Sequence, residues 1–308
     1  MADFLMLSLV PLVVAVTISL TCALLGNFLV LRRQSLIGDA ISHVALPGIV
    51  ASFLITGTLA ASAMMIGAGV AALVTVAMIE LIKHLGRVES SAAMGVVFTA
   101  IFALGVLMLE WNDASGVHLD VEHALYGNLE SLIWFEGVHW SSLFDPKALA
   151  DLPPQLARVA WVGLMVLTFV VVAWRPLVVG SFDSAFAASI QARPVLTDLL
   201  LVIMVAITAI AAFDAVGSII VIAMFICPAA AARLMTNHLG KQVAWSQVFA
   251  LISAVLGYVL AGYGPGWIGF EASLSAAGMI ASLTGLILLL ACLFGPHRRR
   301  DGGQPASA

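Results

Sequence analysis

The sequence places a carboxylate and an imidazole inside an apolar stretch, Ser35-Leu36-Ile37-Gly38-Asp39-Ala40-Ile41-Ser42-His43-Val44-Ala45-Leu46-Pro47-Gly48. Because Asp39 and His43 are four residues apart, a helix over this stretch puts both side chains on one face. An ionisable side chain within a membrane-spanning helix costs about 2.5–3.5 kcal/mol on insertion scales, so it usually faces a partner or a pathway. We expect the pair to mark a place where a cation is handled.

The composition of the chain indicates that its surroundings are a membrane. Of its 308 residues, 62% are hydrophobic and only 10% are charged, whereas a soluble domain carries about 25% charged residues. The apolar runs are long and lack the alternation typical of barrel strands. The sequence therefore predicts an all-α integral membrane protein.

A membrane-spanning helix needs about 20 mostly apolar residues. We predict about nine such helices, at residues 6–31, 36–56, 59–82, 91–109, 157–174, 196–212, 215–235, 243–262 and 273–294. Together they form a single transmembrane domain over residues 1–295. The remaining residues, 296–308, are basic and then polar, and we expect a disordered cytoplasmic tail.

The positions of Lys and Arg predict the orientation of the chain. With the N-terminus outside, only Lys147 and Arg158 of the 13 basic residues lie outside, which leaves 11 on the cytoplasmic side. Positive residues concentrate on the cytoplasmic side of membrane proteins. We therefore predict an outer N-terminus and a cytoplasmic C-terminus.

Two connections are longer than turns. The outer segment 110–156 is acidic and rich in aromatic residues, and we expect part of it, around 121–143, to be a helix lying on or dipping into the membrane. The inner segment 180–194 is mildly amphipathic and too polar to span, which is typical of a short cytoplasmic helix parallel to the membrane.

The sequence carries no sign of an enzyme or of a nucleic-acid-binding protein. Nothing matches the phosphate-binding pattern G-x-x-x-x-G-K-[S/T], so any ATP that drives this protein is hydrolysed on another chain. The basic run His297-Arg298-Arg299-Arg300 follows the last predicted span, where it serves as an orientation anchor near anionic headgroups.

Four segments occur in a fixed order: Gly26–Gly48, Met94–Val106, Asp120–Asn128 and Val216–Leu234. They resemble the permease subunits of metal-ion ABC transporters, which import manganese, zinc or iron(II). The resemblance implies a type II ABC importer-like bundle, similar to the vitamin B12 permease, in a bacterial inner membrane. It also implies a homodimer, a cytoplasmic ABC ATPase and a periplasmic or lipid-anchored metal-binding receptor. The metal is then a substrate, and no cofactor is bound stably.

The resemblance also assigns residues. Asp39 and His43 match the transmembrane acid and histidine of that family, which contact the metal or gate its path. Mn²⁺ and Zn²⁺ both accept such ligands. The alternatives are an intrahelical Asp–His pair or a helix-capping role for Asp39. Phe182, Asp183 and Phe186 match the coupling helix that docks on the ATPase, and a plain surface loop is the alternative.

Three further residues are weaker candidates. Asp120 and His123 belong to a polar cluster in the outer segment, which either attracts cations weakly or is an ordinary solvated loop. Asp214 precedes Val216-Gly217 and is interpreted as a turn former between spans, with a role in metal conduction as the alternative.

Two other classes of protein fit parts of the sequence. An ATP-independent secondary transporter or channel would use the same Asp39/His43 pair. An intramembrane protease needs a serine and a histidine that face each other, but Ser42 and His43 are adjacent in sequence and do not share a helix face. The choice among Mn²⁺, Zn²⁺ and Fe²⁺ stays open, since a site of oxygen and nitrogen ligands accepts all three.

Overall fold

The computed structural model describes residues 4–58, 61–112, 129–137, 139–182, 194–267 and 274–297. Within these ranges the ordered elements are helices, and no strand occurs. Eight helices of this described part are long and apolar enough to cross a membrane, and a shorter apolar helix, Ile220–Met235, accompanies them. The predicted all-α membrane fold is confirmed.

Each of the nine predicted spans coincides with a helix. The first is a short π-helix, η1 (Leu5–Leu9), continued by α2 (Val10–Leu31). The others are α3 (Leu36–Thr56), α4 (Ala61–Gly86), α5 (Ser90–Asn112), α8 (Pro154–Val172), α11 (Pro194–Val216), α12 (Ser218–Met235), α13 (Leu239–Trp267) and α14 (Ala276–Phe294). The ends differ from the prediction by up to five residues, some inside and some beyond the predicted bounds, because an apolar run defines the middle of a helix better than its ends.

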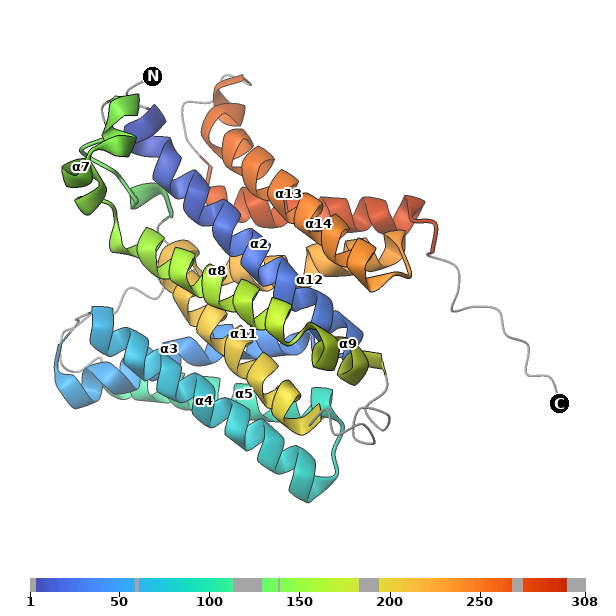
Figure 1. The fold of residues 1–308 in the computed structure, drawn as a ribbon. Helices are drawn as coiled ribbons and strands as arrows, with labels where there is room; N and C mark the ends of the chain where they lie inside the picture. The colour runs from blue at the N-terminus through green and yellow to red at the C-terminus, as the bar shows by residue number, and fades with distance from the viewer. Residues whose placement is uncertain are drawn as a thin grey trace.

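Helix α2 runs through the middle of the bundle, with α3, α4 and α5 on one side and α13 and α14 on the other (Figure 1). Glycines allow the closest approaches. A Cβ atom on Gly26 of α2 would collide with the carbonyl group of Phe225 in α12, and one on Gly257 of α13 would lie 2.6 Å from the Cα of Ile280 in α14. Lipid does not drive apolar helices together, so such backbone proximity supplies much of their packing.

The described part of the outer segment is not one helix. Between α5 and α8 lie the 3₁₀ turns η3 (Leu129–Ser131) and η4 (Trp140–Phe144) and the short helix α7 (Pro146–Ala150). Our prediction of a helix over 121–143 is therefore wrong for its described residues. Trp134 explains the departure, because its backbone N–H donates to Met6 O at 2.9 Å and its Nε1 donates to Ala148 O at 2.8 Å. These bonds hold the buried indole against the start of the first span.

The inner connection begins with a second helix directly after α8. Helix α9 (Trp174–Phe182) follows a single break at Ala173. Pro176 accounts for this break, since a proline lacks the N–H that would continue the α8 hydrogen-bond ladder. In Figure 1 α9 lies beside the C-terminal end of α2.

Candidate functional site

Asp39 and His43 lie on one face of α3, as the spacing predicts. The His43 Nε2 and Asp39 Oδ1 atoms are 3.2 Å apart. Asp39 occupies the first turn of the helix, which begins at Leu36. The side chains are 26% and 36% exposed for Asp39 and His43, respectively. The pair is therefore reachable from outside the chain although it belongs to a membrane-spanning helix.

Helix α5 forms an aromatic wall beside the imidazole. The His43 ring stacks on Phe98, with centroids 5.9 Å apart and planes 17° from parallel, and it meets the edge of Phe102 at 5.6 Å. Gly105 lets α5 approach α3 this closely, because a Cβ there would lie 2.7 Å from Pro47 Cβ. These contacts restrict the orientation of the imidazole, which a metal ligand requires.

The other faces of α3 are packed into the protein. Ile37, Ala40 and Ile41 next to the pair are buried. A Cβ on Gly38 would be 3.0 Å from the Phe225 ring of α12. This packing leaves Asp39 and His43 as a partly exposed polar pair on the face of α3 beside α5.

The chemistry available at this pair is that of two ligands. A carboxylate oxygen and an imidazole nitrogen suit Mn²⁺, Fe²⁺ and Zn²⁺. Within the described ranges, no cluster of three or more His, Cys, Asp or Glu residues is arranged to hold a metal ion. Two ligands do not complete a tetrahedral or octahedral shell, so a bound ion needs further ligands besides this pair.

The other predicted site residues are placed only in part. Asp214 lies in the last turn of α11, not in a connecting turn as we predicted, because the helix continues until Gly217, whose φ of 78° ends it. Phe182 is the final residue of α9 and is 57% exposed. Asp120, His123, Asp183 and Phe186 lie outside the described residues.

A second polar cluster was not predicted. Arg32, at the C-terminal cap of α2, forms an ion pair with Asp198 of α11 and donates from Nε to Ser181 Oγ of α9 at 2.9 Å. Burial lowers the pKa of the Arg32 guanidinium, and the nearby Asp198 carboxylate raises it. An acidic residue near the start of an apolar run was the available signal, but the sequence does not reveal which basic residue it meets.

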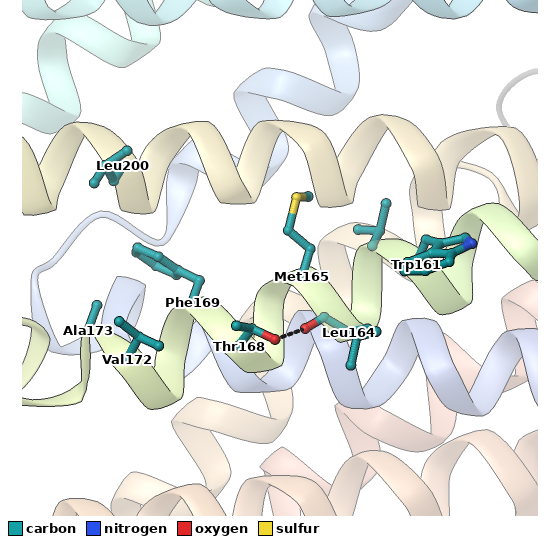
Figure 2. Close-up of a pocket in the computed structure, with 9 residues that line it drawn as sticks. Trp161, Leu164, Met165, Thr168, Phe169, Val172, Ala173 and Leu200 are labelled. Carbon is teal, nitrogen blue, oxygen red and sulfur yellow. Dashed lines mark hydrogen bonds between the residues drawn. The ribbon is translucent and has the colours of Figure 1, made fainter.

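A large apolar groove lies elsewhere, along α8 and α11. Its volume is about 790 Å³, and Figure 2 shows the side chains that line it, among them Trp161, Met165 and Leu200. Its polar side-chain groups are the Trp161 indole N–H and the Thr168 hydroxyl, which donates to Leu164 O of its own helix at 2.8 Å. The lining residues include no ionisable side chain, so the groove does not suit a metal ion.

Comparisons with known proteins identify relatives of this chain. A family model described as the ABC 3 transport family matches residues 4–134 and 148–295. The manganese transport system membrane protein MntD of Bacillus subtilis is 36% identical over 281 residues, which cover 91% of this chain and 90% of that protein. The zinc transport system membrane protein TroD of Treponema pallidum is 34% identical over 283 residues, covering 92% of this chain and 72% of that protein.

A solved structure has a similar fold. It is the structure of PsaBC from Streptococcus pneumoniae in complex with Fab, and the superposition gives a TM-score of 0.68 at 27% sequence identity. The match covers 94% of this chain and 92% of the matched chain. The likeness therefore extends over most of the chain.

Proposed function

This chain belongs to the ABC 3 transport family, and from that premise we propose that it is the permease subunit of an ATP-driven importer for a divalent transition-metal ion. The metal is Mn²⁺, Zn²⁺ or Fe²⁺. One observation carries the proposal to particular residues: Asp39 and His43 form a partly exposed, metal-compatible pair on a membrane-spanning helix. The chain catalyses no covalent step, and a separate ABC ATPase supplies the energy.

The permease works as a homodimer. A carboxylate facing lipid is costly, and Asp39 is partly exposed in one copy of the chain. A second copy placed against this face removes the pair from lipid. It also supplies a second Asp39 and His43, so that four protein ligands surround the ion on the dimer axis.

Access to the ion alternates between the two sides of the membrane. A metal-binding receptor delivers the ion to the outer surface, near the segment 110–156, and the N-terminus lies on the same side. The ATPase docks on the cytoplasmic side, where Phe182 ends α9 with an exposed ring ahead of Asp183 and Phe186. Closure of the ATPase moves these segments and opens the Asp39/His43 site inward.

Removal of either ligand tests the proposed site. We expect Asp39→Ala and His43→Ala to lower metal uptake by more than the roughly 10–100-fold that loss of an outer-shell partner costs. Uptake is measured as cell manganese, zinc and iron content by mass spectrometry, in cells that lack their own importers. Assembly with the ATPase is measured by copurification and stays at the wild-type level.

Ser42→Ala is the matched control. Ser42 lies between the two ligands, but it is buried and its hydroxyl donates to Gly38 O of its own helix at 2.8 Å. We expect this variant to keep wild-type uptake. Full metal accumulation by either ligand variant would refute the site, and uptake that persists without ATP or the ATPase would favour the secondary transporter instead.

A further inference from the structure

Arg32 joins three helices at one end of the bundle. Its side chain is 5% exposed, and its donors point to three acceptors. Nη1 is paired with Asp198 Oδ1 of α11, Nε donates to Ser181 Oγ, and Nη2 donates to Leu177 O of α9 at 3.3 Å. The Ser181 hydroxyl in turn donates to Leu177 O at 2.7 Å, so the α9 partners form one connected group.

Two partners of Arg32 lie near the two ends of the inner segment 180–194, which carries the residues that we assign to ATPase docking. Ser181 is the residue before Phe182, the last residue of α9. Asp198 is four residues beyond Pro194, the first residue of α11, which is about 6 Å along a helix. One guanidinium therefore holds the helix that enters residues 183–193 and the helix that leaves them.

The backbone of Arg32 leads directly to the metal-site helix. Residues 32–35 form a tight turn in which Arg33 N donates to Val30 O at 3.2 Å and Gln34 N donates to Leu29 O at 2.9 Å. Both bonds bind the turn to the end of α2. Helix α3 starts at Leu36 and reaches Asp39 within its first turn. Because this connection is short and hydrogen-bonded, a displacement of Arg32 also displaces the start of α3.

A second route runs through α4. Lys83 and Glu80 form an ion pair of 2.6 Å near the end of that helix, and both interact electrostatically with Asp198. Helix α4 packs on α3 where Gly48 faces Gly67. The charged cluster thus connects α11 to α2, which leads into α3 through the turn, and to α4, which packs on α3.

We propose that Arg32 is a positioning residue that transmits movement of α9 and α11 to the helix carrying Asp39 and His43. The inference rests on the proposed function, because it assumes that the inner segment 180–194 receives the ATPase. Arg32 touches no metal. It sets the position of the α2–α3 turn, and hence of the first turn of α3, according to the position of the two helices it holds.

An arginine suits this role for a geometric reason. The guanidinium is planar and presents five N–H donors in a fixed fork, so it holds acceptors on two helices at a defined separation. A lysine has a single ammonium on a flexible chain and keeps the charge without this fork. Arg32→Lys therefore tests the geometry of the side chain alone, because the charge is kept.

The test measures metal transport per ATP hydrolysed. The permease is reconstituted in liposomes with its ATPase and receptor, and Mn²⁺ uptake and phosphate release are followed together. We expect Arg32→Gln to lower the number of ions transported per ATP by about tenfold, within the range typical of coupling between sites. Arg32→Lys and Ser181→Ala lower the ratio less, while phosphate release continues in all three.

Two further variants distinguish coupling from simple stability. Arg33→Gln changes the exposed arginine next in sequence, and we expect it to keep the wild-type ratio. The exchanged pair Arg32→Asp with Asp198→Arg restores the opposite charges, and we expect it to recover part of the ratio lost in Arg32→Gln.

Each other outcome has a definite meaning. If uptake and phosphate release fall in parallel in Arg32→Gln, Arg32 is only structural and the inference is wrong. If Arg32→Gln does not assemble, Ser181→Ala decides, because it leaves the ion pair in place, and an unchanged ratio there also refutes the inference. A wild-type complex that hydrolyses ATP without importing Mn²⁺, Zn²⁺ or Fe²⁺ refutes the proposed function itself.

Discussion

A single amide side chain fastens α2 to α13. Asn27 is fully buried, and its Nδ2 donates to Ala23 O and to Ser246 Oγ, both at 2.7 Å. Its Oδ1 accepts from Gln242 Nε2 at 3.2 Å. Such bonds replace the water that a membrane interior cannot provide, so each group in the network depends on the others.

Replacing Asn27 should therefore destabilise the bundle. We expect Asn27→Leu to lower the free energy of unfolding by about 1–3 kcal/mol, because Ser246 and Gln242 lose a buried partner. Thermal unfolding of the purified protein in detergent measures the change. Thr168→Val is the control, because the Thr168 hydroxyl donates to Leu164 O of its own helix and joins no second helix in Figure 2. Equal melting temperatures for both variants would contradict a structural role for the network.

At the scale of elements, the contact between α3 and α4 depends on two glycines that face each other. A Cβ on Gly48 would lie 2.7 Å from the Cα of Ala68, and one on Gly67 would collide with the Gly48 carbonyl group. Ser52 adds a hydrogen bond from its hydroxyl to Ala63 O at 2.7 Å. This contact supports, from the side of α4, the helix that carries Asp39 and His43.

We expect Gly67→Ala to push the two helices apart and to cost about 1–3 kcal/mol, as overpacking does. Gly69→Ala is a closely matched control, because it lies on the same helix two residues away and a Cβ there meets nothing within 4 Å. That variant should be neutral or up to about 1 kcal/mol more stable, since alanine favours a helix. Thermal unfolding of both variants checks the prediction. A Gly67→Ala protein as stable as the wild type would show that the contact between α3 and α4 has room for a methyl group.

The elements themselves were predictable from the sequence, and the reason is the membrane. A spanning helix satisfies its own backbone hydrogen bonds, so a long apolar run fixes its existence without knowledge of its neighbours. The Asp39–His43 pair was predictable for the same reason, because both residues belong to one helix. The helical state of Asp214 was missed because it depends on where Gly217 ends α11.

Contacts between elements were not predictable in this way. The aromatic wall of Phe98 and Phe102 belongs to a different helix from His43, and its position depends on how α5 packs. Arg32 and Asp198 are 166 residues apart in sequence. The residues around Arg32 and around Asp198 do not indicate that the two side chains pair, since any acidic side chain near a membrane surface can pair with an arginine. The turn around Trp134 is similar, because distant carbonyl groups hold it.

At the scale of the whole molecule, the number of metal ligands that one chain offers determines how many chains are needed to surround one ion. Each chain offers one Asp39 and one His43, and the described residues hold no larger cluster of metal-binding side chains. If two copies share the ion, its stoichiometry is half that of the protein. If each copy binds separately with water as the other ligand, the stoichiometry is equal.

We therefore expect one metal ion for every two chains. Equilibrium dialysis of the purified permease against Mn²⁺, with metal content and protein counted independently, measures this ratio at saturation. Binding should disappear in His43→Ala and persist in Ser42→Ala, because only the first variant removes a ligand. One ion per chain would contradict the shared site while leaving the permease function in place. If one ion binds per two chains, and binding is lost when the protein is held monomeric, the second copy supplies ligands, since one chain offers only the Asp39–His43 pair.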